Sequence, residues 1–238
     1  MKTDYKDFKY LDFHDSYFCK VEVNSDSLVW VLERVNVSSG CALNPYSCSM
    51  MASEMRVEFA EYSIAENNFD FFRLAEESFD IINVEELMAA DERYTYLFCM
   101  CQGAEGYIEL EITFSNIIFE WERYEAKAWY VYSEEKSYVK EFITNNPDIE
   151  WMVLNSTQGS KMVMELHREL SKSHLLYGIE AMAYAKSEFN DDVLFSMDNG
   201  KCVIVHLTYA KETMENYPKF LEFDDIESAL DCILNGGY

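Results

Sequence analysis

The chain has 238 residues and a net charge of -25, with 19 Lys and Arg against 44 Asp and Glu. This charge repels nucleic acid and anionic membrane surfaces, so we expect neither as a partner. Hydrophobic residues make up 49% of the chain, which is enough for a sizeable core, and the many Tyr and Phe residues favour β-strands.

The seven cysteines indicate a reducing compartment. Their number is odd, no CxxC occurs, and the N-terminal stretch MKTDYKDFKY is too polar for a secretory signal. We therefore expect free thiols, a cytoplasmic location and no transmembrane helix. Cys99 and Cys101 would share one face of a strand, either as a metal pair or as small buried hydrophobes. No second pair has matching spacing, which favours the buried hydrophobes.

Residues 1–140 are predicted to form a β-rich domain, an antiparallel meander or sandwich-like fold. DSYFCKVEV (15–23) and DSLVWVLERVNV (26–37) flank a turn and predict a hairpin. Further strands are expected at 55–64, 94–101, 107–114 and 126–133. NVEELMAADERY (83–94) has helical composition and predicts a helix, with Asn83 as its N-cap. The polar stretch over 134–155 predicts the domain boundary.

Residues 150–238 predict a small α+β domain in the order helix, antiparallel sheet, helix. Met162, Leu166 and Leu170 are four residues apart, which indicates an amphipathic helix. Strands are expected at 179–187, 191–199 and 201–210, with a hairpin turn at MDNGK (197–201) and a fourth strand at 219–225. DDIESALDCIL (224–234) predicts a closing helix capped by Asp224 or Asp225. The whole chain is thus expected to be an α+β protein.

Few residues suggest catalysis. The chain contains no GxGxxG, GxxxxGK[ST], GxSxG or HExxH pattern. The weak catalytic candidates are His14, Asp15, Asp191, Asp192 and His206. Adjacent carboxylates in a strand point to opposite faces, so Asp191 and Asp192 do not form a ready pair. His206 shares its face with Ile204 and Thr208, which makes that face mixed.

The stretch YLDFHDSYFCKVEV (10–23) leaves two interpretations of His14 open. With Asp12 and Asp15 it either belongs to a catalytic or metal-binding site, or it shapes the turn that precedes a hairpin. The turn is favoured, because a site would need His206 or an acidic residue from another element. We assign no cofactor and no metal ion to the chain.

Two stretches resemble uncharacterised bacterial domains. YLDFHDSYFCKVEVNSDSLVWVLERVNV (10–37) resembles the opening hairpin of small β-domains that begin with a His-Asp-Ser turn. HLLYGIEAMAYAKSEFNDDVLFSMDNGKCVIVHLTYA (174–210) resembles a domain with a DDVLF strand and a VHLTW-like strand, with Tyr209 in place of the tryptophan. These resemblances imply a bacterial protein with two modules. By analogy, small acidic proteins of this kind resemble immunity proteins that neutralise toxins.

Three functions follow as hypotheses. The leading one is a protein-binding module, not an enzyme, whose acidic surface attracts a basic partner that aromatic residues then anchor. The four tryptophans, Trp30, Trp121, Trp129 and Trp151, are candidates for exposed anchors. The second is a metal-dependent hydrolase with a site near His14 and His206. The third is a structural module that forms homo-oligomers through exposed aromatics.

Overall fold

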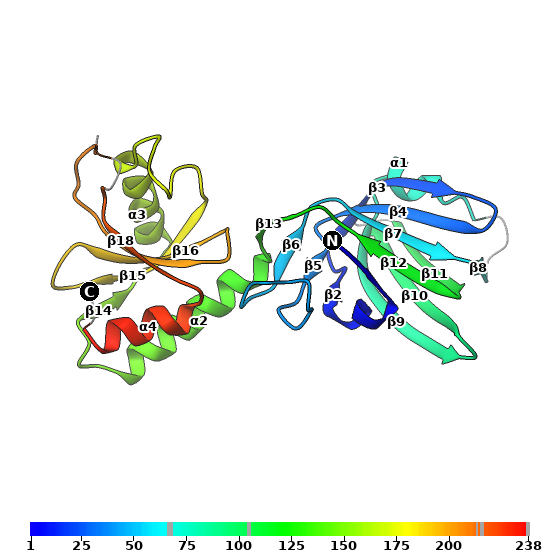
Figure 1. Ribbon diagram of the computed structural model, residues 1–238, viewed down its shortest axis with the longest axis horizontal. Helices are drawn as coiled ribbons and strands as arrows, with labels where there is room; N and C mark the ends of the chain where they lie inside the picture. Colours follow the sequence, from blue (N-terminus) through cyan, green and yellow to red (C-terminus); the bar gives the residue numbers. More distant parts are fainter. Residues whose placement is uncertain (66–68, 104–105, 213, 215–216, 237–238) are drawn as a thin grey trace. The chain divides into compact units, whose positions relative to one another are not determined.

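The computed structural model describes residues 1–65, 69–103, 106–212, 214 and 217–236 (Figure 1). The chain divides into two compact units, the first comprising 1–45 and 49–125 and the second comprising 46–48 and 126–238. The boundary between the units lies earlier in the chain than the boundary expected between domains 1–140 and 150–238. Residues 126–145 belong to the second unit because Val139 packs in its core. The predicted α+β class, rich in β-structure, is confirmed.

The first unit is built on two antiparallel sheets. The larger has nine strands in the order β1-β12-β7-β4-β3-β9-β10-β11-β8, and the smaller has the order β13-β6-β5-β2. Their bounds are β1 Lys2–Asp4, β2 Leu11–Asp12, β3 Ser16–Val23, β4 Ser27–Glu33, β5 Asn36–Val37, β6 Met50–Ala52, β7 Met55–Ala60, β8 Ser63–Ile64, β9 Asp80–Ala90, β10 Arg93–Gln102, β11 Gly106–Phe114, β12 Asn116–Glu120 and β13 Tyr124–Lys127. Two short helices, η1 (Tyr5–Tyr10) and α1 (Phe72–Glu76), complete the unit.

Aromatic side chains fill the core of the first unit. Trp30 is fully buried, and its ring meets those of Phe18, Phe59 and Phe98 edge-on at 4.7–5.0 Å between centroids. Such edge-to-face pairs are the preferred aromatic geometry. The strands of the nine-stranded sheet alternate between this core and the opposite face, as the predicted pattern of β11 requires.

The structure confirms the predicted β3–β4 hairpin and corrects the predicted helix over 83–94. That segment belongs to β9 and to the turn that leads into β10. The hydrogen-bonded ladder between β9 and β10 extends over the whole length of β9 and outweighs the helix propensity of its residues. Pairing within a sheet decides the outcome here, because helix propensity is a weak local preference.

The second unit has one five-stranded antiparallel sheet in the order β14-β15-β16-β17-β18. α3 packs on one face of this sheet, and α2 and α4 pack on the other (Figure 1). The bounds are α2 Trp129–Asn145, β14 Trp151–Val153, α3 Ser156–Glu169, β15 Ala181–Ser187, β16 Asp192–Met197, β17 Cys202–His206, β18 Phe220–Phe223 and α4 Ile226–Leu234. Both predicted helices and all four predicted strands of this part are present.

The strand predicted over 126–133 is wrong beyond Lys127, because α2 begins at Trp129. Val131, Glu135 and Val139 recur at a spacing of four and form the buried side of this helix. The aromatic residues of AKAWYVYS favour strands locally, but the buried face with helical spacing prevails. Of the four tryptophans, only Trp129 is exposed, at 62%, so the other three are not available as anchors.

Candidate functional site

His14 and Asp15 lie in the turn before β3. The Asp12 carboxylate accepts a hydrogen bond from the His14 backbone N–H at 3.0 Å, and His14 Nδ1 bonds the Ile82 carbonyl at 2.8 Å. The other ring nitrogen lies 3.6 Å from the Asp15 carboxylate. Asp15 has a φ of 62°, which aspartate tolerates in tight turns. The contacts of His14 thus hold the turn against the segment that forms β9.

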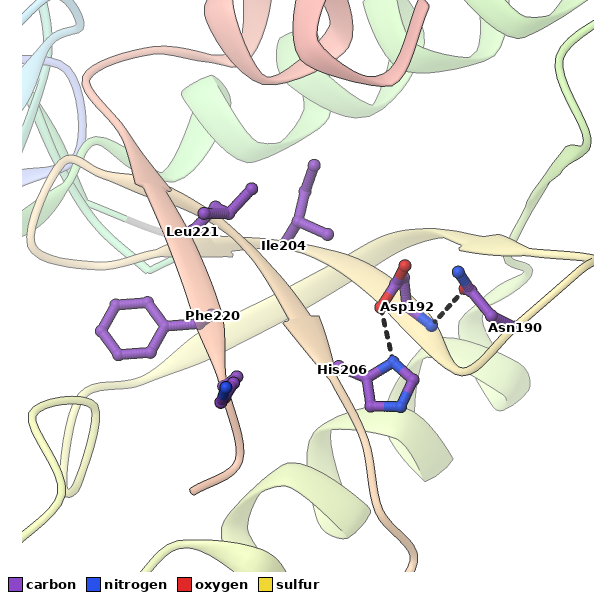
Figure 2. Close-up of a pocket in the computed structure, with 7 residues that line it drawn as sticks. Asn190, Asp192, Ile204, His206, Phe220 and Leu221 are labelled. Carbon is purple, nitrogen blue, oxygen red and sulfur yellow. Dashed lines mark hydrogen bonds and ion pairs between the residues drawn. The ribbon is translucent and has the colours of Figure 1, made fainter. Parts of the chain in front are cut away.

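Asp192 and His206 form a hydrogen-bonded pair on neighbouring strands of the second unit. They are directly opposite each other in the β16–β17 ladder, and His206 Nδ1 lies 2.8 Å from Asp192 Oδ1 (Figure 2). Asp192 is buried, whereas the His206 side chain is 55% exposed. The Asn190 amide oxygen accepts from the Asp192 backbone N–H at 2.9 Å. The carboxylate therefore fixes an imidazole whose Nε2 stays accessible.

Asp191 has separate partners from Asp192. Its carboxylate accepts from Lys186 Nζ at 3.0 Å, and the same ammonium lies 3.0 Å from the Tyr209 hydroxyl. Asp191 is about half exposed and Asp192 is buried, as opposite orientations require. The two adjacent carboxylates do not share a partner among the described residues.

The Asp192–His206 pair lines an open cavity of about 440 Å³. Figure 2 shows Ile204 and Leu221 projecting from β17 and β18 to the same side of the sheet. Lys219 and Asn190 add polar groups to the lining, and Phe220 completes it. The described lining contains no Ser, Thr or Cys nucleophile. The pair therefore places an imidazole held by a carboxylate beside the apolar side chains of Ile204 and Leu221.

The five sequence-predicted site residues fall into two groups. His14 and Asp15 belong to the first unit, and Asp191, Asp192 and His206 belong to the second. His14 lines a different cavity, of about 420 Å³, together with Asp12, Asn83, Glu86 and Tyr96 among others. Each histidine has its polar partners within its own unit.

Three possible metal ligands converge at another place in the first unit. Within the described part of the chain, the ligand atoms of Cys19, Glu33 and Glu54 all lie within 4.8 Å of one another. Burial and the neighbouring carboxylates raise the pKa of the Cys19 thiol to about 12. All seven cysteines are free thiols. We assign no ion to this cluster, because exposed acidic groups commonly gather without one.

The outer side of β9, β10 and β11 carries four carboxylates, two on β9 and two on β11, and we call this surface the acidic face. Cross-strand pairing builds it from three rows, Asp80–Cys101–Tyr107, Asn83–Cys99–Glu109 and Glu85–Leu97–Glu111. No lysine or arginine belongs to these rows, and none of their four carboxylates forms an ion pair with a described residue.

Burial, hydrogen bonds and neighbouring carboxylates raise the pKa values of three groups on the acidic face. Partial burial and the nearby Asp15 carboxylate raise the pKa of Asp80. Burial, Asp80 and Asp15 also raise the pKa of the Cys101 thiol. Tyr107 is 60% exposed, and its hydroxyl donates to Glu109 at 2.8 Å. Hydrogen bonds to Cys99 and Glu109 raise the pKa of Tyr107, so the hydroxyl remains protonated.

A buried polar network was missed at the sequence level. Lys127 Nζ lies 2.6 Å from the Glu135 carboxylate and 2.8 Å from Ser196 Oγ. Ser196 and Tyr184 both donate to the second Glu135 oxygen, at 2.6 and 2.8 Å. The Lys127 side chain is 1% exposed and that of Glu135 is 9%. A Glu on the buried side of a helix, at Val-x-x-x-Glu-x-x-x-Val spacing, is the one sequence signal for this network.

The fold and its surfaces define an α+β protein of two units. No family model matches the chain, and no curated protein or solved structure shows significant similarity to it. None of the described helices is both long enough and apolar enough to cross a membrane.

Proposed function

We propose that the chain is a protein-binding module that recruits a basic partner protein to the acidic face. The observation that carries this proposal is the set of three cross-strand rows on β9–β11, which bear four carboxylates and no cation. Glu85, Glu109 and Glu111 are exposed at the two sides of the surface. Carboxylates that form no ion pair with a described residue are free to pair with the lysines and arginines of another protein.

Charge supplies the first step of the proposed binding. The first unit holds 25 acidic and 9 basic residues, a net charge of -16, against 19 and 10 in the second, a net charge of -9. A field of this sign steers a basic protein and raises the association rate, most strongly at low salt. The acidic face lies in the more highly charged unit.

Aromatic and apolar contacts supply the second step. Tyr107 is the large exposed side chain of the surface, and the central strand presents the partly exposed Leu97 and Cys101 between the two acidic sides. Tyrosine offers a rigid, amphipathic contact area, which makes it a frequent anchor at protein interfaces. The sharpest form of the proposal is a cytoplasmic bacterial protein that neutralises a basic toxin.

The test compares two variants with the same net charge. The first, Glu85→Gln, Glu109→Gln and Glu111→Gln together, neutralises the acidic face. The control, Glu134→Gln, Glu141→Gln and Glu188→Gln together, removes three exposed charges from the second unit. The immobilised full chain is incubated with source-cell lysate, and retained proteins are identified and quantified. We then measure the affinity of the purified retained protein.

We expect a basic protein whose affinity falls roughly tenfold or more in the first variant and remains near the wild-type value in the control. Its affinity for the wild type should also decrease with salt, because the contact is electrostatic. Equal losses in the two variants would assign the effect to net charge alone and would contradict a role for the acidic face. Retention of no basic protein would contradict the proposal as well.

A further inference from the structure

β18 forms one edge of the five-stranded sheet, and β17 is its only partner among the described strands. The His206 backbone N–H donates to the Lys219 carbonyl at 3.0 Å. Hydrogen-bonded pairs alternate along an antiparallel ladder, so the backbone groups of Phe220 and Glu222 point away from β17. No described residue bonds these groups on the outer side. The edge thus offers two donors and two acceptors to another strand.

The cavity beside Asp192 and His206 opens next to this edge. Leu221 pairs with Ile204 in the ladder, and Lys219 lies opposite His206. All four side chains therefore share one face of the sheet. All four residues line the cavity, and Leu221 is 41% exposed. Figure 2 shows Ile204, His206 and Leu221 around it. A strand added to β18 continues the pleat of the sheet. The side chain opposite Leu221 therefore lies at the mouth of the cavity, and its two neighbours point to the opposite face.

The lining indicates which side chain fits best. The Asp192 carboxylate accepts from His206 Nδ1, so the neutral imidazole offers Nε2 as an acceptor. The Lys219 ammonium disfavours a cationic side chain, and the Asp192 carboxylate disfavours an anionic one. A tyrosine satisfies both conditions. Its ring packs on Ile204 and Leu221, and its hydroxyl donates to His206 Nε2.

The opposite side of β18 favours basic residues. Glu222 is exposed and forms no ion pair with a described residue. Residues that flank the tyrosine in an added strand point to this side and lie opposite Phe220 and Glu222. A lysine or arginine there would pair with the Glu222 carboxylate and with the acidic field of the second unit.

We propose that β18 accepts an extended segment of a partner protein, with a tyrosine directed into the Asp192–His206 cavity and basic residues on the opposite side. This surface lies in the second unit and does not depend on the acidic face. The main-chain hydrogen bonds to Phe220 and Glu222 would provide affinity, and the cavity would select the side chain.

The probe is the capped peptide Val-Lys-Tyr-Lys-Val, titrated into the full chain while the NMR signals of His206 and Leu221 are followed. In antiparallel addition, the two lysine N–H groups face β18 and the tyrosine N–H faces away. Methylating both lysine N–H groups should weaken binding roughly tenfold or more, because two hydrogen bonds are lost. Methylating the tyrosine N–H is the matched control and should change little. A Phe in place of the Tyr should weaken binding several-fold.

A protein variant provides the complementary test. Glu222→Pro removes an N–H that points outward and leaves the β17–β18 hydrogen bonds in place, whereas Glu222→Thr keeps the edge donor. We expect the proline variant to lose most of the binding and the threonine variant to retain more of it. Equal affinity of the two methylated peptides would overturn the proposal, as would saturable binding that shifts neither His206 nor Leu221, or no saturable binding at all. None of these outcomes bears on capture by the acidic face.

Discussion

The two large sheets of the molecule leave different surfaces available for binding. The nine-stranded sheet buries one face in an aromatic core and presents charged residues on the other, as the alternation in β11 illustrates. The five-stranded sheet is covered by helices on both faces, and β16 is buried along its whole length. In the first unit the available surface is therefore a sheet face, and in the second it is a sheet edge with an adjoining cavity.

The two units also differ in how polar groups enter the interior. The core around Trp30 is aromatic, and the indole Nε1 of Trp30 has no hydrogen-bond partner among the described residues. The second unit buries the Lys127–Glu135 ion pair and satisfies it with Ser196 and Tyr184. Burying both charges of an ion pair costs desolvation free energy, and removing one partner leaves the other charge buried without a counter-charge. The Lys127–Glu135 pair links α2 to the sheet and makes this helix part of the second unit.

The largest expected effect tests this buried pair. Lys127→Met removes the cation and leaves the Glu135 carboxylate buried without a counter-charge. The free energy of unfolding should fall by about 3–5 kcal/mol, measured by urea denaturation. Lys2→Met breaks an exposed pair with Glu120 and should cost much less, because surface ion pairs contribute little to stability. Similar losses in the two variants would contradict the structural role given to the Lys127 network.

A smaller effect probes the acidic face of the first unit. The pKa of Asp80 is raised in the folded protein by burial and by Asp15. Folding therefore favours the protonated carboxyl, and this contribution is lost as pH rises from the unfolded value of about 3.9 through the raised folded value. Asp80→Asn should melt at a higher temperature than the wild type at neutral pH. The difference should shrink as pH falls toward about 4.

Asp26→Asn is the control for that measurement. It removes one charge from an exposed position in the turn between β3 and β4. The melting temperature of Asp80→Asn could differ from that of the wild type by the same amount at every pH, or Asp26→Asn could show the same difference. Either result would show that net charge, and not the local environment of Asp80, sets the melting temperature.

Residue patterns correctly predicted the elements in which local propensity and tertiary packing favour the same secondary structure. The alternation of Ile108, Leu110 and Ile112 with charged residues placed β11 correctly, and Asp225 caps α4 as one of the two expected residues. The helix predicted over 83–94 failed because its composition is helical, whereas pairing with β10, the strand that directly follows, makes the segment part of a hairpin. α2 was missed because its aromatic residues favour strands. Its buried side packs against the five-stranded sheet, whose strands follow α2 in the chain, so the local sequence does not reveal this contact.

The candidate sites depend on strand register, which local residue patterns determine only in part. The MDNGK turn determines the β16–β17 register, so a hairpin built on it would have paired Asp192 with His206. The acidic face could not be assembled in this way. The β9–β10 ladder contains two irregularities in register, near Thr95 and Cys99, and these set which residues of β9 point outward. Neither irregularity has a turn residue that marks it.

The most direct test of the acidic face is site-specific photocrosslinking in source-cell lysate. The photoreactive residue p-benzoylphenylalanine replaces Tyr107 on the acidic face or, as a matched control, Tyr138 on α2, which is 41% exposed. We expect a covalent adduct with a basic protein from position 107, diminished by high salt and absent from position 138. The same adduct from both positions, or no adduct with a basic protein from position 107, would contradict the proposed role of the acidic face.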